Sequence, residues 1–453
     1  MTKALLSILL IAPLAAAAGF RAGTARADIT PPVPFWLSGY AARTHPAEHV
    51  RQRLWAKALA LDDGHGGRLV VVTMDLVGLP PELSDEVARR CRGQFGLRRD
   101  QLWLNTSHTH SGPVVWPNLR TIFDFNDADQ RKAEAYADGL TGTLVSVAGQ
   151  ALRNLAPGAL RFGTGEAGFA INRRLDALRA KNPGRDFPAP VDRSVPVVEV
   201  RRADGSVPAV LFGYACHNTT LTGDFYEVSG DYAGYAQAAI EKNHPGAQAM
   251  FVILCGGDQN PSPRSKLALA EAHGDELAAS VEKVLASGLQ PVKPGIRTAF
   301  TTTLLPLVPR RREEFEAEAR GNDVLRKRRA ELMLATYVHG GPAQSVRYPV
   351  QAICFGRQLA IVTLGGEVVV DYSNRVKREY TNFPVVVSGY SNGIMSYIPS
   401  ERVLGEGGYE ADDAMAVYAQ PGPYAPGVEE RIMRSIHSVL KSVGVQPGRR
   451  AAE

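Results

Sequence analysis

Two histidines, His108 and His110, stand one residue apart in the segment NTSHTHSGP. They directly follow residues 101–107, an apolar run that predicts a buried strand. Side chains at positions i and i+2 of an extended chain project to the same side, so the two imidazoles converge at the end of this strand. Such a pair suits a metal site or an acid/base pair. An HxH motif alone fits equally well with two hydrogen-bonded histidines on a surface loop.

Three further side chains occupy the same kind of position. His217 ends an apolar strand, Asp258 lies in the loop GGDQNP after another, and Glu367 follows a third and opens a predicted helix. Ligand sites of α/β proteins gather where strands end. Each residue also has a structural alternative: Glu367 could complement a helix N-terminus, Asp258 could cap a turn, and His217 could be a satisfied core histidine.

The glycine-rich stretch at residues 388–413 carries Tyr397 and Tyr409 in polar sequence that packs poorly as core. Exposed loops on a rigid scaffold commonly carry functional side chains. The stretch therefore predicts an active-site loop that presents two phenols.

Alternating strands and helices must position these residues. Apolar β-branched runs predict strands, and amphipathic runs with Pro near the start or Gly near the end predict helices. Strands are expected at 68–78, 101–107, 196–202, 209–216, 249–255 and 384–390, a hairpin at 351–364, and helices at 80–96, 127–154, 229–242, 265–286, 313–336, 366–380 and 428–443. This alternation favours the α/β class, as one large catalytic domain with mixed β-sheets flanked by helices.

Composition narrows the functional classes. The 453 residues include 51 basic and 46 acidic side chains, and the short basic runs at 310–312 and 326–329 fall in a predicted exposed helix. No basic stripe with interleaved aromatic residues is present, which argues against nucleic acid as a partner. No CxxC pair is present either, so a thiolate zinc site is not expected. The thiols of Cys216 and Cys255 are predicted to be buried in strands, with a single disulfide bridge as the alternative.

The first 18 residues predict export. A basic residue, an interrupted apolar run and a small-residue segment have the layout of a secretory signal peptide. No later run approaches the ~20 apolar residues that a membrane-spanning helix needs. We therefore expect a soluble mature protein that is secreted or periplasmic.

With these residues assembled, the sequence resembles the neutral (non-lysosomal) ceramidase family. The resemblance covers most of the chain, and its motifs stand in family order: NTSHTHSGP, INRR, YACHNTT, SGDYAGYA, GGDQNP, GGE and SGYSNG…SYIPSE…GYEA. An ordered set is far more specific than any one motif. It implies a ceramidase-like catalytic domain over residues 19–446.

The resemblance also implies a Zn²⁺ site. The four ligands it implies are His108, His217, Glu367 and Tyr397. His110 would act beside the metal as an acid/base or oxyanion-binding group, while Arg173 of INRR and Tyr409 of GYEA would contact the substrate's polar head. Two imidazoles, a carboxylate and a phenol are ligands that suit zinc. Zinc lowers the pKa of water towards ~7, which would make hydroxide available to attack an amide carbonyl.

Two departures from the family pattern affect the expected substrate. Ceramide-cleaving members carry a serine in a GDxSPN loop, whereas Asn260 stands there in this chain, beside Asp258 in the site loop. An amide can orient a substrate but cannot act as a nucleophile. The chain also ends soon after residues 428–443, so the family's C-terminal β-sandwich domain is not expected, and membrane contact would be peripheral at most.

Three hypotheses follow. The first is an exported zinc amidase acting on an N-acyl lipid such as ceramide. The second keeps the zinc site but replaces the substrate by another amide, an ester or a lactone. The third is a catalytically inactive binding module, against which the retention of His110, Arg173 and Tyr409 beside a full ligand set argues. Acyl-chain length and oligomeric state have no signature in the sequence.

Overall fold

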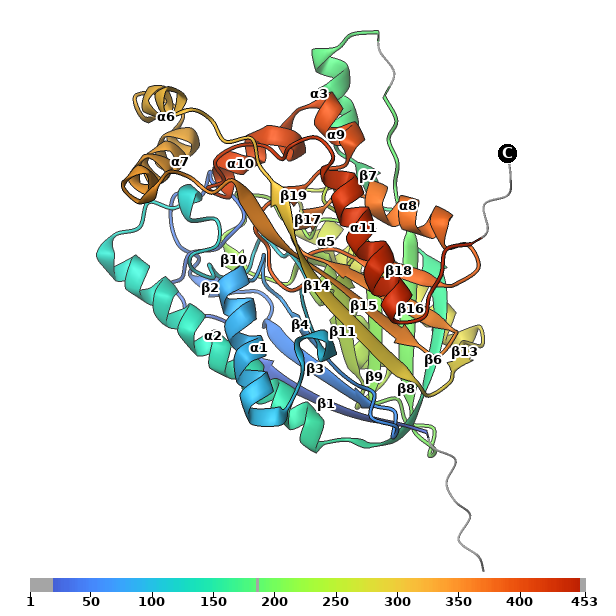
Figure 1. Cartoon of the computed structure of the whole chain (residues 1–453). Coiled ribbons are helices and arrows are strands. Elements are labelled where there is room, and N and C mark those ends of the chain that lie inside the picture. Colours follow the sequence, from blue (N-terminus) through green and yellow to red (C-terminus); the bar gives the residue numbers. More distant parts are fainter. Residues whose placement is uncertain (1–18, 185–186, 449–453) are drawn as a thin grey trace, which may run out of the picture.

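The protein is described by a computed structural model that covers residues 19–184 and 187–448. Residues 1–18, to which the sequence assigns a signal peptide, lie outside this part. Two β-sheets pack face to face, and helices cover their outer faces, which gives the four-layer arrangement visible in Figure 1. The fold is of the α/β class with mixed sheets, as predicted.

The larger sheet has nine strands in the order β11-β9-β8-β6-β1-β3-β4-β5, with β13 paired to β6. Both parallel and antiparallel neighbours occur in it. Its strands are β1 (Phe20–Asp28), β3 (Trp55–Asp62), β4 (Arg68–Met74), β5 (Leu102–Thr106), β6 (Ala156–Glu166), β8 (Ser194–Arg201), β9 (Ala209–Tyr214), β11 (Gln248–Ile253) and β13 (Gln290–Val292).

The second sheet has the order β14-β15-β16-β18. Its strands are β14 (Ile296–Pro306), β15 (Ser345–Phe355), β16 (Leu359–Leu364) and β18 (Val385–Ser388). Strands β15 and β16 form the predicted hairpin. Three two-stranded pairs lie outside both sheets: β2 (His49–Val50) with β10 (Glu227–Val228), β7 (Ala170–Asn172) with β12 (Gln259–Pro261), and β17 (Glu367–Val368) with β19 (Tyr397–Ile398).

The alternation of side chains along each strand explains the layers. In β4, Val70 and Val72 point into a core beneath helices, whereas Leu69 and Val71 point into a core between the two sheets. Ile353 of β15 approaches that inter-sheet core from the other side. Successive side chains of a strand face opposite sides, so a strand that is covered on both faces is apolar throughout.

Helices complete the outer layers. Helices α1 (Pro81–Phe95) and α2 (Asp127–Arg153) cover one half of the larger sheet, and α4 (Asp231–Asn243) and α5 (Leu267–Ala286) cover the other half. Helix α11 (Val428–Ser442) lies across the second sheet (Figure 1). No described helix is long and apolar enough to cross a membrane.

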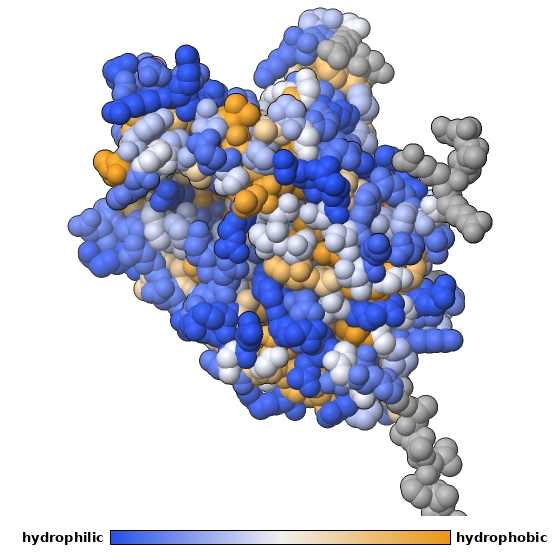
Figure 2. Space-filling model, viewed as in Figure 1, coloured by the Kyte–Doolittle hydropathy of each residue, from blue (hydrophilic) through white to orange (hydrophobic). Residues whose placement is uncertain are grey.

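The predicted helix at 313–336 is two helices, α6 (Arg312–Ala319) and α7 (Val324–Ala335). Gly321 lies in the break, and the Asp323 side chain accepts a hydrogen bond from the Arg326 N–H to cap α7. Figure 2 shows a largely hydrophilic surface over this pair, which agrees with the predicted solvated basic face. Several of its arginines form ion pairs, including Arg326 with Asp413.

All four cysteines are buried and unpaired, as Cys216 and Cys255 were expected to be. Other expectations were incomplete. Strands β1, β3, β6 and β14 have no counterpart among the predicted strands, and the expected helix at 366–380 begins only with α8 (Asp371–Glu379). Glu367 therefore does not open a helix; it lies in the short strand β17.

Candidate functional site

His108 is held rigidly at the end of β5. Its backbone adopts a positive φ of 62°, and its N–H donates to the Leu76 carbonyl at 2.9 Å. Ring atom Nδ1 lies 2.5 Å from the Val77 carbonyl oxygen. Because a carbonyl only accepts hydrogen bonds, Nδ1 carries the proton and Nε2 presents its lone pair to the site.

His217 is fixed in the same tautomer from another strand end. Its Nδ1 lies 2.8 Å from the Gly256 carbonyl and 3.1 Å from that of Gln259. The Arg173 guanidinium donates to its Nε2 at 3.2 Å, which also requires a lone pair there. Complete burial and the nearby Arg173 charge lower the pKa of His217 to about 4, so the ring is neutral at pH 7.

Glu367 and Tyr397 reach the same point because β17 pairs with β19 in parallel, with these two residues opposite each other. One Glu367 oxygen, Oε2, lies 3.0 Å from Nε2 of His108 and 3.0 Å from Nε2 of His217. The Tyr397 hydroxyl lies 3.0 Å from the same His217 nitrogen. The structure thus brings together all four residues proposed as metal ligands, none more than 4% exposed.

The donor set fits a divalent cation. Two imidazole lone pairs face one carboxylate oxygen in a buried site, an arrangement that repels itself unless a proton or a cation lies between them. Nitrogen and oxygen donors of this kind are typical zinc ligands. The ring nitrogens of His108, His217 and His110 also lie within 4.8 Å of one another.

His110 stands beside this cluster. Its Nε2 is 3.1 Å from Nε2 of His108, and its Nδ1 is buried without a hydrogen-bond partner among the described residues. Burial and the neighbouring histidines lower its pKa well below the usual value, so the ring is a neutral base. The Tyr40 ring packs edge-on against it with centroids 4.8 Å apart. Gly39 leaves room for the ring, since a Cβ there would lie 2.4 Å from it.

Arg173 contacts both the cluster and side chains outside it. Its guanidinium donates to the Tyr397 hydroxyl at 3.0 Å, to Glu410 at 2.9 Å and to the Asn260 side-chain oxygen at 3.4 Å. Burial opposes its charge, but Tyr397 and Glu410 outweigh burial and keep its pKa well above the ordinary value. Tyr409 contacts Arg173 from the solvent side: Tyr409 is 44% exposed, and its ring centroid lies 5.6 Å from the guanidinium carbon of Arg173.

Asp258 is the predicted site residue that the structure places elsewhere. It is fully buried and does not line the cavity, and its two carboxyl oxygens accept from Asn172 Nδ2 and from the Val370 N–H, each at 2.9 Å. Its backbone carbonyl accepts the Arg173 N–H at 2.9 Å. Asp258 therefore positions the strands behind the site and does not face a substrate.

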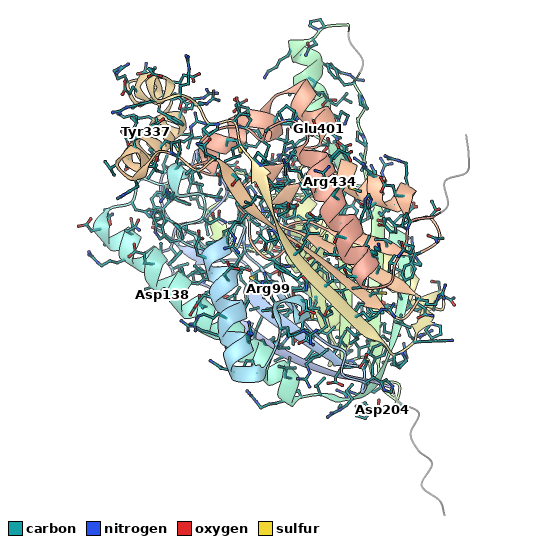
Figure 3. The ribbon with its side chains drawn as sticks, viewed as in Figure 1. Arg99, Asp138, Asp204, Tyr337, Glu401 and Arg434 are labelled. Atoms are coloured by element: carbon teal, nitrogen blue, oxygen red, sulfur yellow. The ribbon has the colours of Figure 1, made fainter. Side chains whose placement is uncertain are left out.

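The cluster forms part of the wall of a cavity of about 570 Å³. Helix α9 (Glu401–Glu406) brings Glu406 to this wall and is anchored by Glu401, whose carboxylate accepts the Gly427 N–H at 2.7 Å near the start of α11 (Figure 3). Glu406 in turn accepts from Arg174, which lines the cavity too, at 3.0 Å. A cavity of this size holds a small-molecule head group with part of a chain.

Several residues of the site escaped the sequence prediction. The Tyr418 hydroxyl donates a short hydrogen bond to the second Glu367 oxygen, and the Tyr390 ring packs against His108 with centroids 4.6 Å apart. Tyr390 and Glu410 stand within segments that carry the resemblance, so their motifs could have indicated them. Tyr418 has no such local signal.

Comparison with known proteins identifies the family of the chain. A sequence model described as "Neutral/alkaline non-lysosomal ceramidase, N-terminal" matches residues 20–275, more than half of the chain. The chain belongs to this family. It is 26% identical over 255 residues to the neutral ceramidase of Pseudomonas aeruginosa and 27% identical over 244 residues to that of Mycobacterium tuberculosis. These alignments cover 54% and 50% of the chain but only 37% and 38% of the two relatives, so the chain spans less than two fifths of their length there.

The fold is likewise that of a family member. The crystal structure of the neutral ceramidase from Pseudomonas aeruginosa superposes with a TM-score of 0.73 at 20% identity, covering 96% of this chain and 76% of that one. A second solved structure, of a ceramidase complexed with C2, gives a TM-score of 0.71. The arrangement of sheets and helices is therefore shared along nearly the whole chain.

Proposed function

We propose that this ceramidase-family protein is an exported zinc-dependent hydrolase that cleaves the amide bond of an N-acyl lipid. The observation that supports it is the convergence of the His108 and His217 lone pairs on the Glu367 carboxylate, at the wall of a cavity. Tyr397 completes a set of two nitrogen and two oxygen donors. The names of the relatives make ceramide the nearest candidate substrate.

The residues around the ligand set would divide the remaining work. His108, His217, Glu367 and Tyr397 would hold a zinc ion, which would supply Lewis-acid polarisation and lower the pKa of water. His110 is neutral and its Nε2 faces the cluster, 3.1 Å from Nε2 of His108, so this nitrogen takes up or returns a proton beside the scissile bond. Arg173 and Tyr409 present a guanidinium and a phenol to the oxygen on which negative charge develops.

A substrate other than ceramide is the second candidate, and Asn260 favours it. This residue stands where ceramide-cleaving relatives carry a serine, and its side-chain oxygen faces Arg173 at 3.4 Å. An amide, an ester or a lactone of different shape would react by the same chemistry.

Metal analysis and hydrolysis assays test the proposal. We expect the purified protein to contain close to one zinc per chain by mass spectrometry, and H108A and H217A to lose most of it. Hydrolysis of N-acyl amides and esters should stop on chelation and return with zinc. H244A, which alters a partly exposed histidine paired with Glu282, should keep both metal and activity. Undiminished hydrolysis by metal-free protein would contradict the mechanism.

Two further experiments test export and the substrate loop. Cell fractionation should find the mature chain outside the cytoplasm, without its first ~18 residues. N260S should raise ceramide cleavage relative to other amides if the loop selects the substrate. An unchanged ratio would assign selectivity to another part of the cavity.

A further inference from the structure

The cavity beside the ligand set carries two positive charges that no carboxylate of the described residues neutralises. Among its lining residues, Arg173 and Arg174 are held by Glu406 and Glu410. The other lining carboxylate, that of Asp413, pairs with Arg326 at 2.9 Å. The remaining lining cations are Arg264 and Lys181, and within the described ranges 19–184 and 187–448 neither has a carboxylate at ion-pair distance.

Arg264 is held close to the catalytic histidine. It is half-buried in the loop after β12, and it donates to the Tyr40 hydroxyl at 3.2 Å. That hydroxyl donates in turn to the Leu221 carbonyl at 3.0 Å, and the Tyr40 ring packs against His110. One aromatic ring therefore separates the Arg264 charge from His110.

Two more hydrogen-bond donors share this wall. Thr219 is only 3% exposed, lines the cavity, and its hydroxyl has no partner in the described structure. Asn260 lines it too; its oxygen faces Arg173, and its amide nitrogen donates to no described residue. The loops run side by side, since the Ser265 N–H donates to the Thr220 carbonyl at 2.8 Å. A buried polar group left without a partner is costly, so this wall favours a ligand that accepts several hydrogen bonds.

We propose that Arg264, Thr219 and Asn260 form a subsite for an anionic group, a carboxylate or phosphate, on the amine portion of the N-acyl substrate. This inference rests on the proposed hydrolase function and narrows its substrate class. A guanidinium, a hydroxyl and an amide N–H that line one cavity match the oxygens of such an anion. The neutral diol of ceramide supplies no charge for this guanidinium. Hydrolysis would consume one water, break the carbon–nitrogen bond, and release a fatty acid and the protonated anionic amine.

Four substrates with the same twelve-carbon acyl chain test the subsite: N-lauroylglycine, N-lauroyl-phosphoethanolamine, N-lauroylethanolamine and C12 ceramide. We expect the zinc-loaded full chain to favour an anionic amide over N-lauroylethanolamine, and the two anionic arms distinguish carboxylate from phosphate. R264Q should lower this preference roughly 10- to 100-fold, chiefly through KM, as expected for a lost charged hydrogen bond. R264K should restore part of it. R153Q, at the exposed C-terminal end of α2 and outside the cavity lining, should leave it unchanged.

The outcomes separate the two proposals. An R264Q protein that keeps its melting temperature and its preference overturns the subsite, as does equal loss on charged and neutral substrates. Wild-type hydrolysis without any charge preference also overturns the subsite while the hydrolase function stands. No hydrolysis of any of the four amides by the zinc-loaded protein overturns both.

Discussion

Glu410 is the residue on which the position of Arg173 depends most directly. Its carboxylate accepts from Arg173 Nε at 2.9 Å and from Arg174 Nη1 at 2.5 Å, and it is only 5% exposed. In E410Q, one oxygen remains to accept, and the new amide N–H groups face a guanidinium. Arg174 keeps a second carboxylate in Glu406. Arg173 has no other carboxylate at ion-pair distance in the part of the chain that the structure describes.

The expected loss of stability in E410Q follows from this difference between Arg173, which loses its carboxylate partner, and Arg174, which keeps one. Removing one partner of a buried ion pair costs about 3–5 kcal/mol, because the remaining charge stays buried without compensation. Arg173 retains some solvent contact, with 20% of its side chain exposed, so we expect the lower end, about 3 kcal/mol. The guanidinium would also lose the contact that aims it at Tyr397, and a displacement of about 1 Å near reacting groups lowers kcat up to ~100-fold.

Calorimetry and steady-state kinetics check both expectations on zinc-loaded protein. We predict a melting temperature several degrees lower for E410Q and a fall in kcat, with the zinc content unchanged. E406Q is the matched control: Arg174 then keeps Glu410, and Arg402 keeps Asp371 at 2.9 Å, so its losses should be clearly smaller. Equal losses in the two variants, or none in E410Q, would refute the assignment of Glu410 as the residue that positions Arg173.

Three other predictions each concern a single residue. G39A should reduce hydrolysis at least tenfold, because φ is 91° there and the added Cβ would lie 2.4 Å from the His110 ring. G64A is the control in the same assay: its φ is 72° and the space around it is open, so it separates the clash from backbone strain. Burial raises the pKa of Asp231 to about 6, so the folded carboxyl holds its proton more tightly than an unfolded one. The free energy of unfolding therefore falls as pH rises from about 4 to about 6. D231N should flatten that slope in urea titrations at pH 4.5 and 7. K57M should lower the free energy of unfolding by about 3–5 kcal/mol, since the Lys57 side chain is 2% exposed and its ammonium donates hydrogen bonds to three acceptors. A stability equal to wild type in the same titration would contradict this prediction.

Positions at strand ends could be predicted from the sequence because they depend on local pattern. His108 and His217 each follow an apolar run, and such runs become buried strands whose ends meet at one edge of a sheet. The ring tautomers could not be predicted. They are set by the carbonyls of Val77 and Gly256, which belong to other loops and have no sequence signature.

Pairings between distant segments explain the errors. Glu367 was expected to open the helix predicted at 366–380, but β17 pairs with β19 thirty residues away. Strand β1 contains small and charged residues, and its place between β3 and β6 comes from partners on both sides. Strand formation depends on cross-strand and same-face neighbours more than on local preference, so a single sequence indicates such strands weakly.

The turn that begins at Tyr409 shows why the motif GYEA could be recognised before its role could be derived. Residues Tyr409–Asp413 form one turn of π-helix, a rare form that is concentrated at functional sites. Within it, Tyr409 is 44% exposed and Glu410 5% exposed, yet both contact Arg173, one with its ring and the other with its carboxylate. Two consecutive residues thus bind one guanidinium from the solvent side and from the interior. Neither contact is encoded by spacing alone. The double variant Y409E/E410Y keeps the composition of the motif, and we expect it to lose both contacts with Arg173.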